Sequence, residues 1–265
     1  MQGGSGSQAF ATKAGKAGLG FFAGVRAVFG GVGFVVSTPS VWGWALVPVV
    51  IAAALFGGVG AGAVWAGTEL SSRMMTGEQG SAWLSFGLWA LWALRIVFWI
   101  VGLVVAFVIA MSLAQPLSGF ALETIAKKQE LALGGRGRGW PDQPFVSGFV
   151  RSLRVTLTAL AVGLPILAVL AAITLLFPPA SVVTIPLKFV VTGVLAAYDL
   201  LDYPFSIRGR GVRDRLGFIR DNFAAVLGFG VTMAALLLVP GMGLFLLPFG
   251  VAGASRLVFE RDARR

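Results

Sequence analysis

The chain has 265 residues, of which 57% are hydrophobic and 12% are charged, and its mean hydropathy is +0.87. The charged share is about half that of an average soluble domain, and a water-soluble fold of this size cannot bury so much apolar surface, so a free soluble domain is excluded. The sequence contains neither Cys nor His. Disulfides, thiolate or imidazole metal sites and Cys- or His-based catalysis are therefore excluded, and we expect no metal, no cofactor and no enzymatic activity.

Residues 1–18 are rich in Gly, Ser and Ala and carry two lysines, which predicts a flexible N-terminal tail. They lack the short apolar core and the small-residue cleavage site of a signal peptide. Because no long polar segment interrupts the remainder, we expect one helical membrane domain over residues 19–258, followed by a charged C-terminal tail over 259–265.

Four long stretches of the sequence, 27–68, 96–122, 155–187 and 222–255, carry no ionisable side chain. A helix needs roughly 20 mostly apolar residues to cross the ~30 Å hydrocarbon core, where it must satisfy its own backbone. The stretches therefore predict an all-α integral membrane protein. Ranked by length and flanking residues, they give about six helical segments: Trp42–Ala66, Ile96–Ala114, Val155–Phe177, Val182–Ala197, Phe223–Val239 and Leu244–Val258.

The last four segments form two hairpins, because only short Pro-containing turns, 178–181 and 240–243, separate their members. The segments of the final pair are shorter than the roughly 20 residues that a span requires. We therefore expect two long spans plus two short hairpins, for which crossing and re-entry both stay open. Gly20–Gly24 and Gly58–Gly62 have the small-xxx-small spacing of close helix contacts, for which we favour chance or packing within the chain over a dimer seam.

Two single charges lie beside apolar stretches, Arg95 and Lys188. An anion site on a permeation pathway is the functional interpretation of Arg95. The structural interpretation, which we favour, lets the side chain reach the membrane surface, and we treat Lys188 in the same way. Aromatic residues suited to that surface recur every three positions just before Arg95, at Trp83, Phe86, Trp89 and Trp92.

The formal net charge of +10 comes from Lys and Arg concentrated before the first segment, over 123–154, over 208–220 and at the C-terminus. The positive-inside rule places these regions, and both termini, in the cytoplasm. A nucleic-acid patch around 207–220 is the rival interpretation. Because topology already accounts for these arginines, we expect no nucleic-acid partner.

Two polar motifs lie where predicted segments end. The first contains Gln115, Pro116 and Glu123, and the second contains Asp199, Asp202, Tyr203 and Pro204. Acids three residues apart share a helix face, so Asp199 and Asp202 could pair with the arginines that follow. A structural latch between cytoplasmic loops is one interpretation of both motifs, and carboxylates that line an ion path are the other.

Several of these features, in this order, resemble the family of the bacterial sulfate permease CysZ and the eukaryotic etoposide-induced membrane protein. The features are Phe21–Gly24, then Pro39, Trp42 and Pro48, then Gln115, Pro116 and Glu123, the segment Tyr198–Pro204, and residues 239–254. The resemblance implies a bacterial inner-membrane homo-oligomer with two long spans and partly inserted hairpins, which admits sulfate for cysteine synthesis.

The resemblance also implies a Gly-Leu-Arg segment that binds sulfate at the start of the first span. Here that region reads Thr38-Pro39-Ser40-Val41-Trp42, without arginine. The free N–H groups of Ser40, Val41 and Trp42 can still hold an anion at a helix N-terminus, so these are the candidate substrate-binding residues. An ordinary helix cap, with Ser37 or Thr38 as capping residue, is the alternative.

The leading function is accordingly permeation of sulfate or a related oxyanion. The alternative is a non-transporting scaffold or regulatory protein of the same family, whose basic loops engage membrane lipids or partner proteins.

Overall fold

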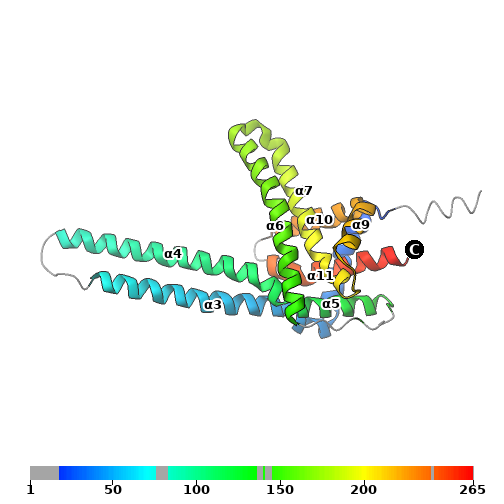
Figure 1. Cartoon of the computed structure of the whole chain (residues 1–265), viewed down its shortest axis with the longest axis horizontal. Coiled ribbons are helices and arrows are strands. Elements are labelled where there is room, and N and C mark those ends of the chain that lie inside the picture. Colours follow the sequence, from blue (N-terminus) through cyan, green and yellow to red (C-terminus); the bar gives the residue numbers. More distant parts are fainter. Residues whose placement is uncertain (1–17, 76–82, 136–139, 141–144, 240–241, 265) are drawn as a thin grey trace, which may run out of the picture. The chain divides into compact units, whose positions relative to one another are not determined.

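A computed structural model describes residues 18–75, 83–135, 140, 145–239 and 242–264, and every regular element in that part of the chain is a helix (Figure 1). The all-α prediction is confirmed. The chain divides into two compact units. We call residues 18–46 and the described residues from 119 onward the body, and residues 47–118 the α3–α4 hairpin.

All six predicted segments are helices. They are α3 (Pro39–Met75), α4 (Trp83–Leu117), α6 (Phe145–Leu176), α7 (Ser181–Leu200), α10 (Phe223–Leu237) and α11 (Met242–Asp262). All except α10 are longer than predicted. Among the described residues, four stretches are long and apolar enough to cross a membrane: Pro39–Arg73, Trp92–Leu117, Leu153–Leu176 and Pro178–Ser206.

In the part of the chain that the structure describes, four α-helices were not predicted: α2 (Phe21–Ser37), α5 (Gly119–Ala132), α8 (Asp202–Ser206) and α9 (Val212–Asp221). The basic region over 123–154 was interpreted as a loop, which is wrong for residues 123–132, in α5, and for residues 145–154, in α6. Helix α5 is amphipathic, because its buried residues follow the i, i+3, i+4 spacing of one helix face. These buried residues are Ala121, Leu122, Ile125, Ala126 and Gln129. The arginine-rich stretch after 207 is likewise partly helical, as α9, which meets α10 at a bend of 96°.

Within the body, helix α2 packs against both α10 and α11. A Cβ at Gly24 would collide with the carbonyl oxygen of Ala225 on α10, and one at Gly31 would lie 2.5 Å from the carbonyl oxygen of Phe249 on α11. These glycines therefore let the three backbones approach closely. The final two predicted segments, α10 and α11, contact α2 as well as each other. The turn residues 240–241 between them lie outside the described residues.

The other hairpin of the body consists of α6 and α7, which run side by side and are joined by the short 3₁₀ helix η1 (Pro178–Ala180) (Figure 1). Helix α7 also packs against α10. A Cβ at Gly193 on α7 would lie 2.6 Å from the carbonyl oxygen of Gly230 on α10, so only glycine fits this crossing. The crossing fixes the inner half of α7 to the core of the body.

The α3–α4 hairpin has a different character, because most of its large apolar side chains are exposed. Its two helices meet at small residues and rings: Phe56 and Phe107 lie edge to face with centroids 6.5 Å apart, and Gly102 packs on Ala63. Gly58 and Gly62 face open space. So much exposed apolar surface is suited to hydrocarbon rather than to water.

Arg95 lies within α4 rather than before it, since the helix begins at Trp83. Its guanidinium carbon lies 5.1 Å from the ring centroid of Trp92 and 4.8 Å from that of Trp99, which are cation–π distances. At the other end of the chain α11 continues to Asp262, so it includes residues that the sequence analysis assigned to a tail. The predicted N-terminal tail lies outside the described residues, apart from Gly18.

Candidate functional site

The start of the first span is the junction between α2 and α3, where Thr38 separates the two helices. Ser40 is exposed, whereas Val41 is fully buried. The N–H of Val41 donates to the carbonyl oxygen of Thr38 over 2.9 Å. The indole N–H of Trp42 donates to the carbonyl oxygen of Val35, also over 2.9 Å. Of the three candidate substrate-binding residues, Val41 is therefore the enclosed one, whereas Ser40 and Trp42 are exposed.

A lysine that is distant in sequence reaches this junction. The ammonium of Lys128, on α5, donates to the carbonyl oxygen of Ser40 over 2.7 Å. The rings of Trp44 and Phe120 hold the same two helices together edge to face, with centroids 6.2 Å apart. The structure thus brings a positive charge to the first turn of α3, which the local sequence lacks.

On its other side the junction is apolar. Trp42 lines an open cavity of about 270 Å³ together with residues of α2, α3 and α11. The remaining lining residues are Val35, Val36, Ala45, Leu46, Phe245, Pro248 and Phe249. None of the described residues that line this cavity is charged, so the polar chemistry of the junction lies with Ser40 and Lys128.

The first polar motif is divided between the two units. Gln115 and Pro116 lie near the end of α4, where the carbonyl oxygen of Gln115 accepts a hydrogen bond of 3.0 Å from the hydroxyl of Ser118. Glu123 lies on α5 in the body, and its carboxylate accepts a hydrogen bond of 3.0 Å from the hydroxyl of Ser206 on α8. The glutamate therefore links α5 to the second motif.

The second motif contains a buried ion pair. Arg215, on α9, donates to the carboxylate of Asp202 over 2.9 Å, and the side chains are 1% and 11% exposed, respectively. The guanidinium carbon lies 4.2 Å from the ring centroid of Tyr198, whose hydroxyl accepts a further bond of 3.2 Å. Tyr203 and Pro204 are buried in α8, and Asp199 is half-buried on α7. This pair is the kind of contact that the latch interpretation requires.

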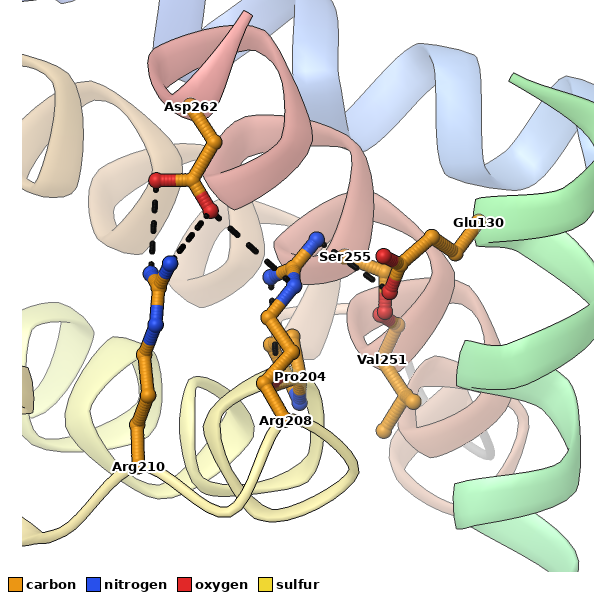
Figure 2. Close-up of polar contacts among 7 residues, drawn as sticks. All are labelled: Glu130, Pro204, Arg208, Arg210, Val251, Ser255 and Asp262. Atoms are coloured by element: carbon orange, nitrogen blue, oxygen red, sulfur yellow. Dashed lines mark hydrogen bonds and ion pairs between the residues drawn. The ribbon is translucent and has the colours of Figure 1, made fainter. Parts of the chain in front are cut away.

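A second set of ion pairs joins three parts of the body (Figure 2). Arg208 pairs with Glu130 of α5 at 3.2 Å and with Asp262 of α11 at 4.0 Å. Arg210 pairs with the same Asp262 at 3.0 Å. We call these four residues the Arg208 cluster. The cluster fixes the loop after α8 to α5 and to the end of α11.

The contacts of Lys128, of Ser206 and within the Arg208 cluster were not predicted from the sequence. The basic residues were interpreted as a topological signal, and the arginines after Asp202 also as possible partners of Asp199 and Asp202. Arg210 lies 52 positions from its partner Asp262, and Lys128 lies 88 positions from Ser40. Local spacing in the sequence therefore does not reveal these contacts. Among the described residues no group of three or more Asp, Glu, Cys or His side chains could hold a metal ion.

Helices of this length and apolarity, with polar contacts gathered in the body, define a multi-pass helical membrane protein. The family model described as sulfate transporter CysZ/etoposide-induced protein 2.4 matches residues 27–248. The chain belongs to this family.

Curated relatives carry the name sulfate transporter CysZ. The one from Pseudomonas aeruginosa PAO1 is 26% identical over 188 residues, which is 69% of this chain and 74% of the relative. The one from Pseudomonas fluorescens Pf0-1 is 29% identical over 191 residues, 68% of this chain and 72% of the relative. The one from Pseudomonas syringae pv. tomato is 28% identical over 186 residues, 68% and 71%.

Proposed function

We propose that the protein is a permease for sulfate or a closely related oxyanion, which supplies sulfate for cysteine synthesis and binds its substrate at the start of α3. Membership of the family supports the activity, and the relatives carry the name of sulfate transporters. The observation that carries the location is the ammonium of Lys128, 2.7 Å from the carbonyl oxygen of Ser40.

The chemistry of this junction suits an anion. A helix N-terminus carries a partial positive charge, and Pro39 in the first turn removes an N–H that has no partner in the helix. Lys128 adds a full positive charge that binds oxyanions as a point charge, without the bidentate geometry of a guanidinium. We therefore propose that Lys128 replaces the arginine implied by the family resemblance, with Ser40 beside it and Val41 and Trp42 fixing the turn.

The proposal includes the membrane topology and assembly. The protein lies in the bacterial inner membrane as a homo-oligomer, with both termini and the basic segments on the cytoplasmic side. The Asp202–Arg215 pair and the Glu123–Ser206 bond then act as the latch between cytoplasmic segments. Gln115 and Pro116 lie at the end of the second span. Asp199, Tyr203 and Pro204 belong to the latch segment.

A non-transporting scaffold is the second candidate, and one observation favours it. The carboxylates of Glu123 and Asp202, which an ion path would use, are engaged in contacts within the body. A scaffold would use the basic segments to hold anionic lipids or partner proteins.

Uptake of labelled sulfate into liposomes tests the proposal, with empty liposomes as the blank. Thiosulfate, selenate and phosphate serve as competitors. A permease gives saturable uptake that close sulfate analogues reduce. Uptake equal to the blank, from protein that elutes as a single folded oligomer, would reject the transport activity in favour of the scaffold.

A further inference from the structure

Lys188 is the only Lys, Arg, Asp or Glu between Arg154 and Asp199 in the sequence. It lies on α7, in the stretch Pro178–Ser206 that is apolar and long enough to cross a membrane. The residues around the closed end of the α6–α7 hairpin are apolar and strongly exposed, among them Leu175, Leu176 and Val182. A half-buried lysine in such a hairpin needs polar partners.

Two threonine hydroxyls lie near this lysine, and one of them contacts it directly. The ammonium donates to the hydroxyl oxygen of Thr174, on α6, over 2.9 Å. That hydroxyl lies 2.7 Å from the carbonyl oxygen of Leu170 and 2.7 Å from the hydroxyl of Thr184, which is buried on α7. If Thr174 donates its proton to Leu170, its oxygen accepts from both Lys188 and Thr184. We call Thr174, Thr184 and Lys188 the hairpin cluster.

Within the described residues, the positive charge of the hairpin cluster has no counter-ion. An ammonium has three N–H donors, and the contacts within the described part of the chain use one of them. Neither α6 nor α10, which pack against α7, contains an acidic residue. The acids of α8 and α11 are engaged elsewhere, Asp202 with Arg215, Glu260 with Arg256 and Asp262 with Arg210.

We infer that the hairpin cluster is a binding site for a tetrahedral oxyanion, either free sulfate or phosphate or the phosphate of a lipid headgroup. Two free N–H groups of Lys188 bind the anion, and Thr174 positions the ammonium through the bond that it accepts. An anion here supplies the missing counter-charge, and its hydrogen bonds to a cation are stronger than neutral ones. The inference does not rest on transport, because binding is measured at equilibrium.

The test uses the full-length protein with Lys128→Met, so that the site proposed at the start of α3 does not contribute. Labelled sulfate is titrated in detergent, and retention of phosphatidylglycerol is measured by native mass spectrometry against phosphate-free diacylglycerol. Lys188→Met removes the charge and Lys188→Arg keeps it. Thr174→Val removes the positioning hydroxyl, and Thr158→Val is its matched control, because Thr158 lies on the same helix and makes the same kind of backbone bond, 2.8 Å to Arg154.

We expect Lys188→Met to weaken binding of sulfate or of phosphatidylglycerol by about tenfold or more, as for the loss of a charge-assisted hydrogen bond. Lys188→Arg retains binding, and Thr174→Val weakens it while Thr158→Val does not. A loss confined to sulfate identifies a free oxyanion as ligand, and a loss confined to phosphatidylglycerol identifies the headgroup.

Unchanged binding of both ligands in Lys188→Met would overturn the inference. The cluster would then only stabilise the contact between α6 and α7, and Lys188→Met would lower the unfolding temperature without changing binding. Should Lys188→Met fail to fold, the comparison of Thr174→Val with Thr158→Val decides, and equal binding by these two variants would overturn the inference as well.

Discussion

The body and the α3–α4 hairpin differ in where their charged and apolar side chains lie. In the body, charges are buried in pairs, and glycines such as Gly24 let backbones touch. In the hairpin, apolar side chains are exposed, and the polar contacts are local, as between Arg73 and Glu69 on successive turns of one helix. The hairpin therefore relies on lipid as its solvent, whereas the body depends on contacts between distant parts of the chain.

Breaking an ion pair should produce the largest difference in lost stability between the body and the α3–α4 hairpin. Asp202→Asn leaves the buried guanidinium of Arg215 without its counter-charge, which costs about 3–5 kcal/mol of stability where one partner of a buried pair is removed. Glu69→Gln breaks the exposed pair in α3, which is worth about 0–1 kcal/mol. Chemical unfolding in detergent measures both. Equal losses would show that the body does not depend on this pair.

Helix contacts should show the next largest difference. Gly24→Val forces α2 away from the backbone of α10, and overpacking of this kind costs about 1–3 kcal/mol. The matched variant Gly58→Val faces open space on α3 and should have little effect. Thermal unfolding in the same detergent compares the two. A variant at Gly58 that destabilises as much as one at Gly24 would reveal a packing surface on the α3–α4 hairpin.

A smaller effect is expected at the Arg208 cluster. The side chain of Arg208 is 11% exposed and bridges two carboxylates, so Arg208→Gln should cost about 1.5–3 kcal/mol, the range for hydrogen bonds to charged groups. Arg210, whose side chain is 37% exposed, pairs with one of the same carboxylates, so Arg210→Gln should cost less than about 1 kcal/mol. Chemical unfolding ranks the two. The reverse order would contradict the geometry in Figure 2.

The sequence predicts the apolar helices well because hydrocarbon demands long uninterrupted apolar runs. Their ends are predicted poorly, since α4 begins at Trp83 rather than at Ile96 and α6 at Phe145 rather than at Val155. Arg95 and Arg154 lie inside these two helices. The predicted segments begin directly after these charged residues, because a charge interrupts the apolar run although the helix continues through it.

The candidate site was predictable only in part. Asp202 was selected as a possible partner of the arginines that follow it, but spacing could not choose Arg215 among them. Lys128 was hidden because its contact with Ser40 joins positions 88 residues apart, and its helix was taken for a loop. The amphipathic spacing of Ala121, Leu122, Ile125 and Ala126 was the one local signal that could have revealed α5 and the face from which Lys128 reaches α3.

Sulfate uptake by liposomes that contain Lys128→Met tests the central claim most directly, with Lys127→Met as the matched control. Lys127 is the neighbour on α5, but its ammonium lies over the ring of Trp140, 5.6 Å from the centroid. If Lys128 supplies the positive charge at the start of α3, uptake falls about tenfold or more in Lys128→Met, as for a lost charge-assisted bond, and stays within about twofold of the original protein in Lys127→Met. Equal uptake by the two variants, both eluting as the original oligomer, would contradict the assignment of this junction as the anion site.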